Sequence, residues 1–82
     1  MNNPNPALAR FAASLARLRG AAGWTQYALA KAAGIPPITV ARLESGQRNP
    51  SLMMACRLAD ALGCTMDELC GREGENGSSQ GG

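Results

Sequence analysis

The spacing of the apolar residues places the strongest constraint on the fold of this chain. From residue 7 to residue 70, apolar side chains recur every three or four positions, and Gly or Pro interrupts the pattern about once per dozen residues. This period gathers apolar groups along one side of a helix, whereas a half-buried strand would alternate apolar and polar residues. The sequence therefore predicts an all-α fold, a compact domain of five short helices at residues 7–70.

Capping residues and helix breakers give the bounds of these helices. A Ser or Thr at the N-cap accepts an N–H from the first turn, and glycine supplies the left-handed residue that ends a helix. We expect helices at residues 7–21, 26–33 and 37–44, a fourth between Ser51 and Gly63, and a fifth after Thr65. The side chains predicted to face the core are Leu8, Phe11, Leu15, Leu18, Leu29, Ala30, Ile35, Val40, Leu43, Leu52, Ala55, Cys56, Ala59, Leu62, Met66, Leu69 and Cys70.

Pro36 and Pro37 fit a helix only at its beginning. Inside a helix, proline removes a hydrogen bond and clashes with the preceding turn. The first turn tolerates it, and a residue before proline favours the extended conformation of an N-cap. A helix that ends at Gly34 and another that starts at Pro37 are then joined by a tight turn, which is the layout of a helix-turn-helix.

The charges and the chain ends are distributed unevenly. Residues 1–57 carry seven Arg or Lys and one Glu, a net charge of +6, whereas residues 58–82 carry a net charge of −4. A basic half suits a polyanion such as nucleic acid, although the whole-chain charge of +2 does not identify a partner. Residues 1–6 and 71–82 are poor in apolar groups, so we expect flexible tails, the second rich in Gly, Ser and Glu.

Several classes of function lack the residues that they need. The three cysteines form no CxxC pair and the chain has no histidine, so no metal site is expected. No clustered carboxylate pair precedes the acidic tail and no phosphate-binding glycine loop is present, so we expect neither an enzyme nor a cofactor or small-molecule ligand. Without a signal-like or membrane-spanning apolar run, the chain is predicted to be soluble and cytoplasmic.

The chain resembles the phage-repressor and Cro (XRE) family of helix-turn-helix proteins over roughly residues 7–70. The shared positions run without gaps and comprise Leu18-Arg19, Gly23, Thr25-Gln26, Leu29-Ala30, Gly34-Ile35, Glu44, Gly46, Pro50-Ser51, Leu58-Ala59, Ala61-Leu62-Gly63 and Asp67-Glu68-Leu69. The resemblance implies that the third helix enters the major groove of double-stranded DNA.

The base-facing positions that the resemblance implies are Pro37, Ile38, Ala41 and Arg42. Arg42 can bind guanine in a bidentate manner, whereas Ile38 and Ala41 can only press on thymine methyl groups. Thr39, beside them, is expected to reach a base or a phosphate. Sharp reading of sequence would therefore depend mainly on Arg42.

Two segments match positions that contact phosphate in the family. Thr25 and Gln26 stand at the start of the second helix, where free N–H groups favour anions. Gln47, Arg48 and Asn49 occupy the loop after the third helix, where Arg48 would give affinity without sequence information.

Five further residues have expected roles outside the DNA face. Arg19 and Glu44 match a pair that forms a structural salt bridge between the first and third helices of the family. Tyr27, Met53 and Met54 stand where the family prefers charged or polar residues. We expect Tyr27 to lie along a sugar-phosphate backbone or on a partner subunit, and at least one methionine to face solvent as a possible interface.

The leading hypothesis is a sequence-specific transcriptional regulator that binds double-stranded DNA as a homodimer and acts as a repressor. Its size is similar to that of Cro-like repressors, restriction-modification controller proteins and antitoxins. The alternative is a helix-turn-helix scaffold used as a protein-interaction module with little base reading. The run Pro36-Pro37-Ile38 favours that alternative, because polar base readers are common at the positions of Pro37 and Ile38.

Overall fold

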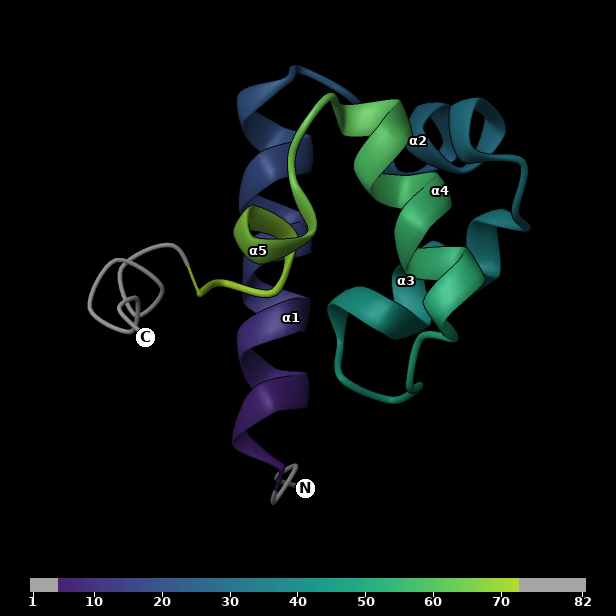
Figure 1. Cartoon of the computed structure of the whole chain (residues 1–82). Helices are drawn as coiled ribbons and strands as arrows, with labels where there is room; N and C mark the ends of the chain where they lie inside the picture. The colour runs from purple at the N-terminus through teal and green to yellow at the C-terminus, as the bar shows by residue number, and fades with distance from the viewer. Residues whose placement is uncertain (1–4, 73–82) are drawn as a thin grey trace.

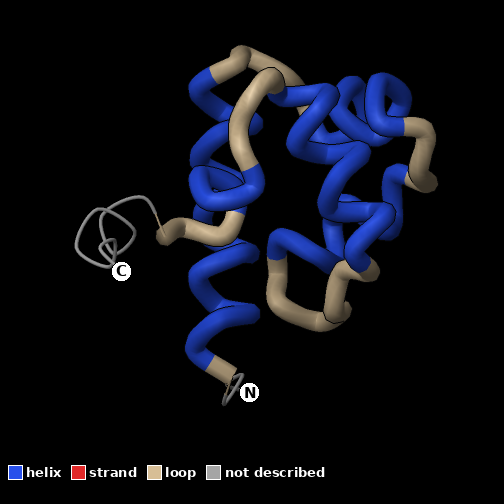
Figure 2. Tube along the Cα trace, viewed as in Figure 1, coloured by secondary structure: helices blue, strands red, loops and turns tan. Residues whose placement is uncertain are grey.

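The computed structural model describes residues 5–72, and within them it contains five helices and no strand (Figure 2). The helices are α1 (Pro6–Ala21), α2 (Gln26–Ala33), α3 (Pro37–Glu44), α4 (Leu52–Leu62) and α5 (Met66–Leu69). The long α1 stands on one side, α2, α3 and α4 gather beside it, and the short α5 lies against α1 (Figure 1). The prediction of an all-α fold of five helices is confirmed.

Side-chain caps explain where the helices begin. The hydroxyls of Thr25, Ser51 and Thr65 each accept an N–H from the third residue after them, at 3.0 Å in all three cases. Glu68 returns a hydrogen bond to the N–H of Thr65, which completes a capping box. Each cap satisfies one of the N–H groups that the first turn leaves without a partner in the helix.

The first helix begins one residue earlier than predicted. The side chain of Asn5 accepts hydrogen bonds from the N–H groups of Ala7 and Leu8, and Pro6 occupies the first helical position. Asn5 and Pro6, which the sequence assigned to the tail at 1–6, are therefore part of the start of α1. The rest of that tail, and residues 73–82 of the second, lie outside the described residues.

The core receives side chains from all five helices. The largest fully buried side chains are Leu15, Leu29, Val40, Leu43, Leu58 and Leu69. Each stabilises the fold by about 1.5–3 kcal/mol through removal of apolar surface from water. Because α3 packs on both α1 and α2, the position of its outer face is determined by this core.

Leu52 was predicted to face the core, and this was wrong. It is the first residue of α4 and is 75% exposed, whereas the first buried residue of that helix is Ala55. The helix leaves the loop at Ser51 and reaches the core only after its first turn, so the predicted buried face of α4 began one turn too early.

Among helices of residues 5–72, none is both long and apolar enough to cross a membrane.

Candidate nucleic-acid interface

The turn between α2 and α3 is built around one glycine. Gly34 has φ 73°, in the left-handed region that side chains rarely adopt, and its carbonyl lies 3.4 Å from Nη1 of Arg57 on α4. The next residue, Ile35, donates its N–H to the carbonyl of Ala30 at 3.0 Å. Pro36 then takes the extended N-cap conformation, with φ −65° and ψ 142°, and α3 starts at Pro37. The turn therefore needs only three residues between the two helices.

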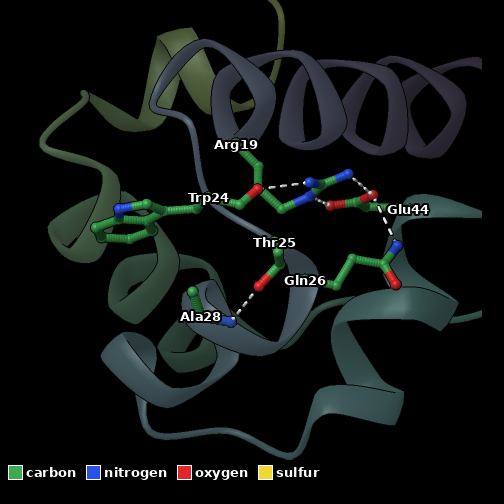
Figure 3. Close-up of polar contacts among 6 residues, drawn as sticks. All are labelled: Arg19, Trp24, Thr25, Gln26, Ala28 and Glu44. Atoms are coloured by element: carbon green, nitrogen blue, oxygen red, sulfur yellow. Dashed lines mark hydrogen bonds and ion pairs between the residues drawn. The ribbon is translucent and has the colours of Figure 1, made fainter.

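A polar cluster joins α1, α2 and α3 behind this turn (Figure 3). Arg19 donates to both carboxylate oxygens of Glu44, from Nε at 2.6 Å and from Nη2 at 3.0 Å, and donates from Nη1 to the carbonyl of Trp24 at 2.7 Å. Gln26 donates from Nε2 to Oε1 of Glu44 at 3.0 Å. We call Arg19, Trp24, Gln26 and Glu44 the Glu44 cluster. It holds the end of α3 against the end of α1 and the start of α2.

The charges of the Glu44 cluster stabilise each other. The Glu44 side chain is only 8% exposed and that of Arg19 is 21% exposed. Burial by itself pushes the pKa of Glu44 up, but hydrogen bonds from Arg19 and Gln26 outweigh it and the pKa is lowered. The hydrogen bond to Glu44 raises the pKa of Arg19. Both groups are thus charged at neutral pH, and the structure brings together the two residues expected to pair.

The hydrogen bonds that Gln26 and the Trp24 carbonyl make in this cluster were not predicted. The sequence gives Gln26 the role of a phosphate contact, and its side chain is half-buried with one amide N–H directed to Glu44. A primary amide has a second N–H and a carbonyl oxygen, so a phosphate contact is still open to it. No local signal in the sequence predicts this bond, because Gln26 and Glu44 lie 18 positions apart.

One side of α3 faces solvent. Pro37, Ile38 and Arg42 are exposed, Ile38 by 56%, and Ala41 is half-buried between them. The spacing of these residues puts them on a single helical face. Four of the five expected base-facing residues therefore lie together, and we call them the α3 face.

The fifth, Thr39, does not lie on the α3 face. It is 5% exposed and points to the interior with Val40 and Leu43, which share its side of the helix. The expectation that Thr39 reaches a base or a phosphate is corrected accordingly. Its neighbours in the sequence are outward-facing, but a rotation of about 100° per residue turns it away from them.

The expected phosphate contacts flank the α3 face at two places. Gln47, Arg48 and Asn49 are all exposed in the loop that follows α3. Thr25 is exposed at the start of α2, where its hydroxyl oxygen already accepts the N–H of Ala28. Its hydroxyl proton can still be donated. Arg48 thus adds an exposed positive charge in the loop that follows α3.

The three residues expected at an interface differ in their surroundings. Tyr27 is largely exposed on α2, with the Lys31 ammonium group 6.0 Å from the centre of its ring. Met53 is 64% exposed, whereas Met54 is half-buried and packs against the core.

Within residues 5–72, no group of three His, Cys, Asp or Glu side chains that could hold a metal ion is found.

Comparison with known proteins identifies the family. A helix-turn-helix family model, HTH_3, matches residues 15–69. The transcriptional regulator AnsR of Bacillus subtilis is 44% identical over 59 residues, which are 72% of this chain and 51% of AnsR. The phage CTXphi repressor RstR of Vibrio cholerae is 40% identical over 58 residues, which are 71% of this chain and 52% of RstR. The chain thus spans about half the length of the curated relatives it matches.

Solved structures show the same fold. The restriction-modification controller protein C.AhdI from Aeromonas hydrophila superposes with a TM-score of 0.73 at 40% identity, over 76% of this chain and 94% of C.AhdI. The hypothetical transcription factor NHTF from Neisseria gives a TM-score of 0.80 at 25% identity, over 95% of this chain and 92% of NHTF.

These findings confirm the resemblance that the sequence showed. The proteins found are named as regulators or a controller protein rather than as enzymes, as expected for this chain. The matched residues 15–69 include the α2–α3 turn, the α3 face and every member of the Glu44 cluster. The chain belongs to the HTH_3 helix-turn-helix family.

Proposed function

We propose that this chain is a sequence-specific transcriptional regulator that inserts α3 into the major groove of double-stranded DNA. The observation that carries the proposal is the α3 face, an exposed helical surface with an arginine on it, held in a fixed orientation by the Glu44 cluster. A reading helix must keep its orientation while its outer side chains remain free. The α3 face meets both conditions.

The residues of the interface would have two roles, base contacts and phosphate contacts. Arg42 would read guanine through two hydrogen bonds, worth roughly 1–3 kcal/mol of discrimination, and Ile38 and Ala41 would contact thymine methyl groups. Arg48, Gln47 and Asn49 would bind phosphates and hold the register on the duplex. Gln26 would add a phosphate contact at the start of α2 through the N–H that Glu44 leaves available.

One copy of the α3 face supplies little discrimination, so we propose that the chain acts as a homodimer. The helix has eight residues, and only one of its four outer residues is a strong hydrogen-bond donor. Two copies would read two half-sites about 34 Å apart on one side of the duplex. Such a dimer would act as a repressor by covering a promoter.

A protein-interaction module is the second candidate, and the exposure of Ile38 and Pro37 favours it. An apolar side chain in that position suits a protein groove as well as a thymine methyl group. The two functions differ in their dependence on salt, because phosphate contacts release counterions and protein contacts of apolar groups do not.

Selection from a genomic fragment library separates the two functions. The wild-type chain is expected to enrich a small set of fragments, to protect a two-fold related site in footprinting, and to lose affinity steeply as salt increases. If no fragment is bound more tightly than a random duplex, the regulator proposal fails. The protein-interaction module then becomes the better explanation of the α3 face.

A further inference from the structure

The outer side of α4 carries a stripe of side chains that no described helix covers. Met53, Arg57 and Asp60 are spaced by four and three residues, so they lie on one side of the helix, and all three are exposed. The opposite side holds the buried residues Ala55, Leu58 and Ala59. We call Met53, Cys56, Arg57, Asp60 and Ala61 the α4 outer face; Cys56, which the sequence predicted to face the core, lies on this side of the helix instead.

This face is more apolar than a solvated helix surface needs to be. Met53 is 64% exposed, and Leu52 beside it is 75% exposed. A hollow of about 130 Å³ adjoins the face, lined by Ile35, Ser51, Met53, Met54 and Arg57. Exposed apolar side chains beside a shallow hollow are typical of a surface that another protein covers.

The two charges of the face are arranged so that a second copy can satisfy them. Arg57 makes one long contact, from Nη1 to the carbonyl of Gly34 at 3.4 Å, and a guanidinium has five N–H donors. No ion pair within residues 5–72 involves the carboxylate of Asp60. If two α4 helices pack antiparallel about an axis between positions 57 and 60, Arg57 meets the partner's Asp60 twice.

The rest of the face is also self-complementary in this register. The same axis places Cys56 against the partner's Ala61, and Met53 near the end of the partner's α4, which stops at Leu62. These are small or apolar side chains, and Cys56 and Ala61 are each half-buried in the single chain. The α4 outer face shares no residue with the α3 face, so docking there leaves the reading surface uncovered.

We propose that a second copy of this chain docks antiparallel on the α4 outer face, with two Arg57–Asp60 pairs across the two-fold axis. The inference rests on the proposed function, since it names the surface through which the DNA-reading homodimer forms. A helix of 11 residues is about 16 Å long. We therefore expect a contact smaller than the roughly 800 Å² per partner of a standard interface, and a free dimer that is weak.

Charge reversal tests the pairing directly. Arg57→Asp sets two carboxylates against each other at each of the two pairs beside the axis, and Asp60→Arg sets two guanidinium groups there. Each variant alone is expected to weaken self-association about tenfold or more, because two attractive pairs per dimer become two repulsive ones. An equimolar mixture of the two variants is expected to form a heterodimer of about wild-type affinity. Interactions within one chain cannot produce that rescue.

Sedimentation equilibrium and native mass spectrometry provide the readout, for the full chain from about ten micromolar to about one millimolar. The matched controls are Arg17→Asp on α1 and Asp67→Arg on α5, which make the same charge changes at exposed positions outside α4. They are expected to dimerise like the wild type. Met53→Asp is an independent probe of the apolar part of the contact and is expected to abolish dimerisation over this range.

The proposal is overturned if the wild type is monomeric at every concentration and on DNA, which would leave the face to a different partner. It is also overturned if the single variants associate like the wild type, or if their mixture stays dissociated. Fragment selection is measured separately on the wild type. If the chain selects DNA fragments but the mixed variants do not associate, the proposed function stands and the α4 contact is rejected. If the mixed variants dimerise but the wild type selects no DNA fragment, the α4 contact is supported and the proposed function is rejected.

Discussion

Arg19→Ala removes the residue that ties α1 to the end of α3. Three hydrogen bonds go with it, two to Glu44 at 2.6 and 3.0 Å and one to the carbonyl of Trp24 at 2.7 Å. The Glu44 side chain is 8% exposed, so its carboxylate is left in a site largely shielded from water with the Gln26 amide still donating to it. The substitution therefore leaves the buried Glu44 carboxylate without a cationic partner, and does more than remove one ion pair.

The structure sets the expected size of this effect. Removing one partner of a buried ion pair costs about 3–5 kcal/mol. Because Arg19 is itself 21% exposed, water can fill part of the space that its side chain leaves, and we expect the lower end, about 3 kcal/mol. For a domain of this size that lowers Tm by roughly 12–24 °C. Thermal and urea unfolding followed by circular dichroism measure the loss, and a DNA titration measures the loosened orientation of α3.

Two comparisons separate the charge effect from general damage to α1. Arg17→Ala, at an exposed position of the same helix, is expected to change the free energy of unfolding by less than about 0.5 kcal/mol. In a double-mutant cycle, Arg19→Ala with Glu44→Gln is expected to cost clearly less than the sum of the single changes, because the neutral amide leaves no stranded charge. Unchanged melting and unchanged DNA affinity in Arg19→Ala would refute this reasoning, as would additivity in the cycle.

Three further predictions test other parts of the fold. Since the pKa of Glu44 is lowered in the folded chain, the stability that its charged form provides is present above the ordinary pKa of 4.5 and is lost as pH falls through the lowered pKa. Urea unfolding at a series of pH values should show a loss of stability below about pH 4.5 that is smaller in Glu44→Gln, and equal curves for the two proteins would contradict this role of Glu44. Gly34→Ala should cost about 1 kcal/mol in thermal unfolding, because φ is 73° while the new Cβ would come no closer than 3.7 Å to Nη1 of Arg57; no loss would mean that the turn readily changes conformation. Thr65→Ala should cost about 1 kcal/mol by removing the capping box, and faster amide exchange at Glu68 should accompany it; exchange like that of the wild type would show that the cap is dispensable.

The helices could be predicted because their signals are local. Thr25 and Ser51 cap the helices that follow them, and Gly34 and Gly63 end helices with positive φ. Each of these features acts within a few residues of the chain, so the sequence contains all the information. The start of α1 was missed by one residue because Asn5 was counted with the polar tail instead of as a cap.

The orientation of particular side chains could not be predicted in the same way. Helical spacing alone is enough to turn Thr39 away from its outward-facing neighbours, whereas the 75% exposure of Leu52 depends on where α4 reaches the core. The bond from Gln26 to Glu44 spans 18 positions in the chain, and it depends on the angle at which α2 meets α3. The pairing of Arg19 with Glu44 was expected from the family resemblance, whereas spacing alone gave no reason for it.

Comparison of Arg42→Ala with Arg48→Ala separates base reading by α3 from sequence-independent binding to phosphate. Binding of each variant to the selected site and to a random duplex is measured over a range of salt concentrations, with Arg17→Ala as the control outside the interface. Arg42→Ala is predicted to lose about 1–3 kcal/mol on the selected site and little on the random duplex. Arg48→Ala is predicted to weaken both similarly and to reduce the salt slope by about one. Equal effects of the two substitutions on both duplexes would contradict the account of α3 as the reading helix.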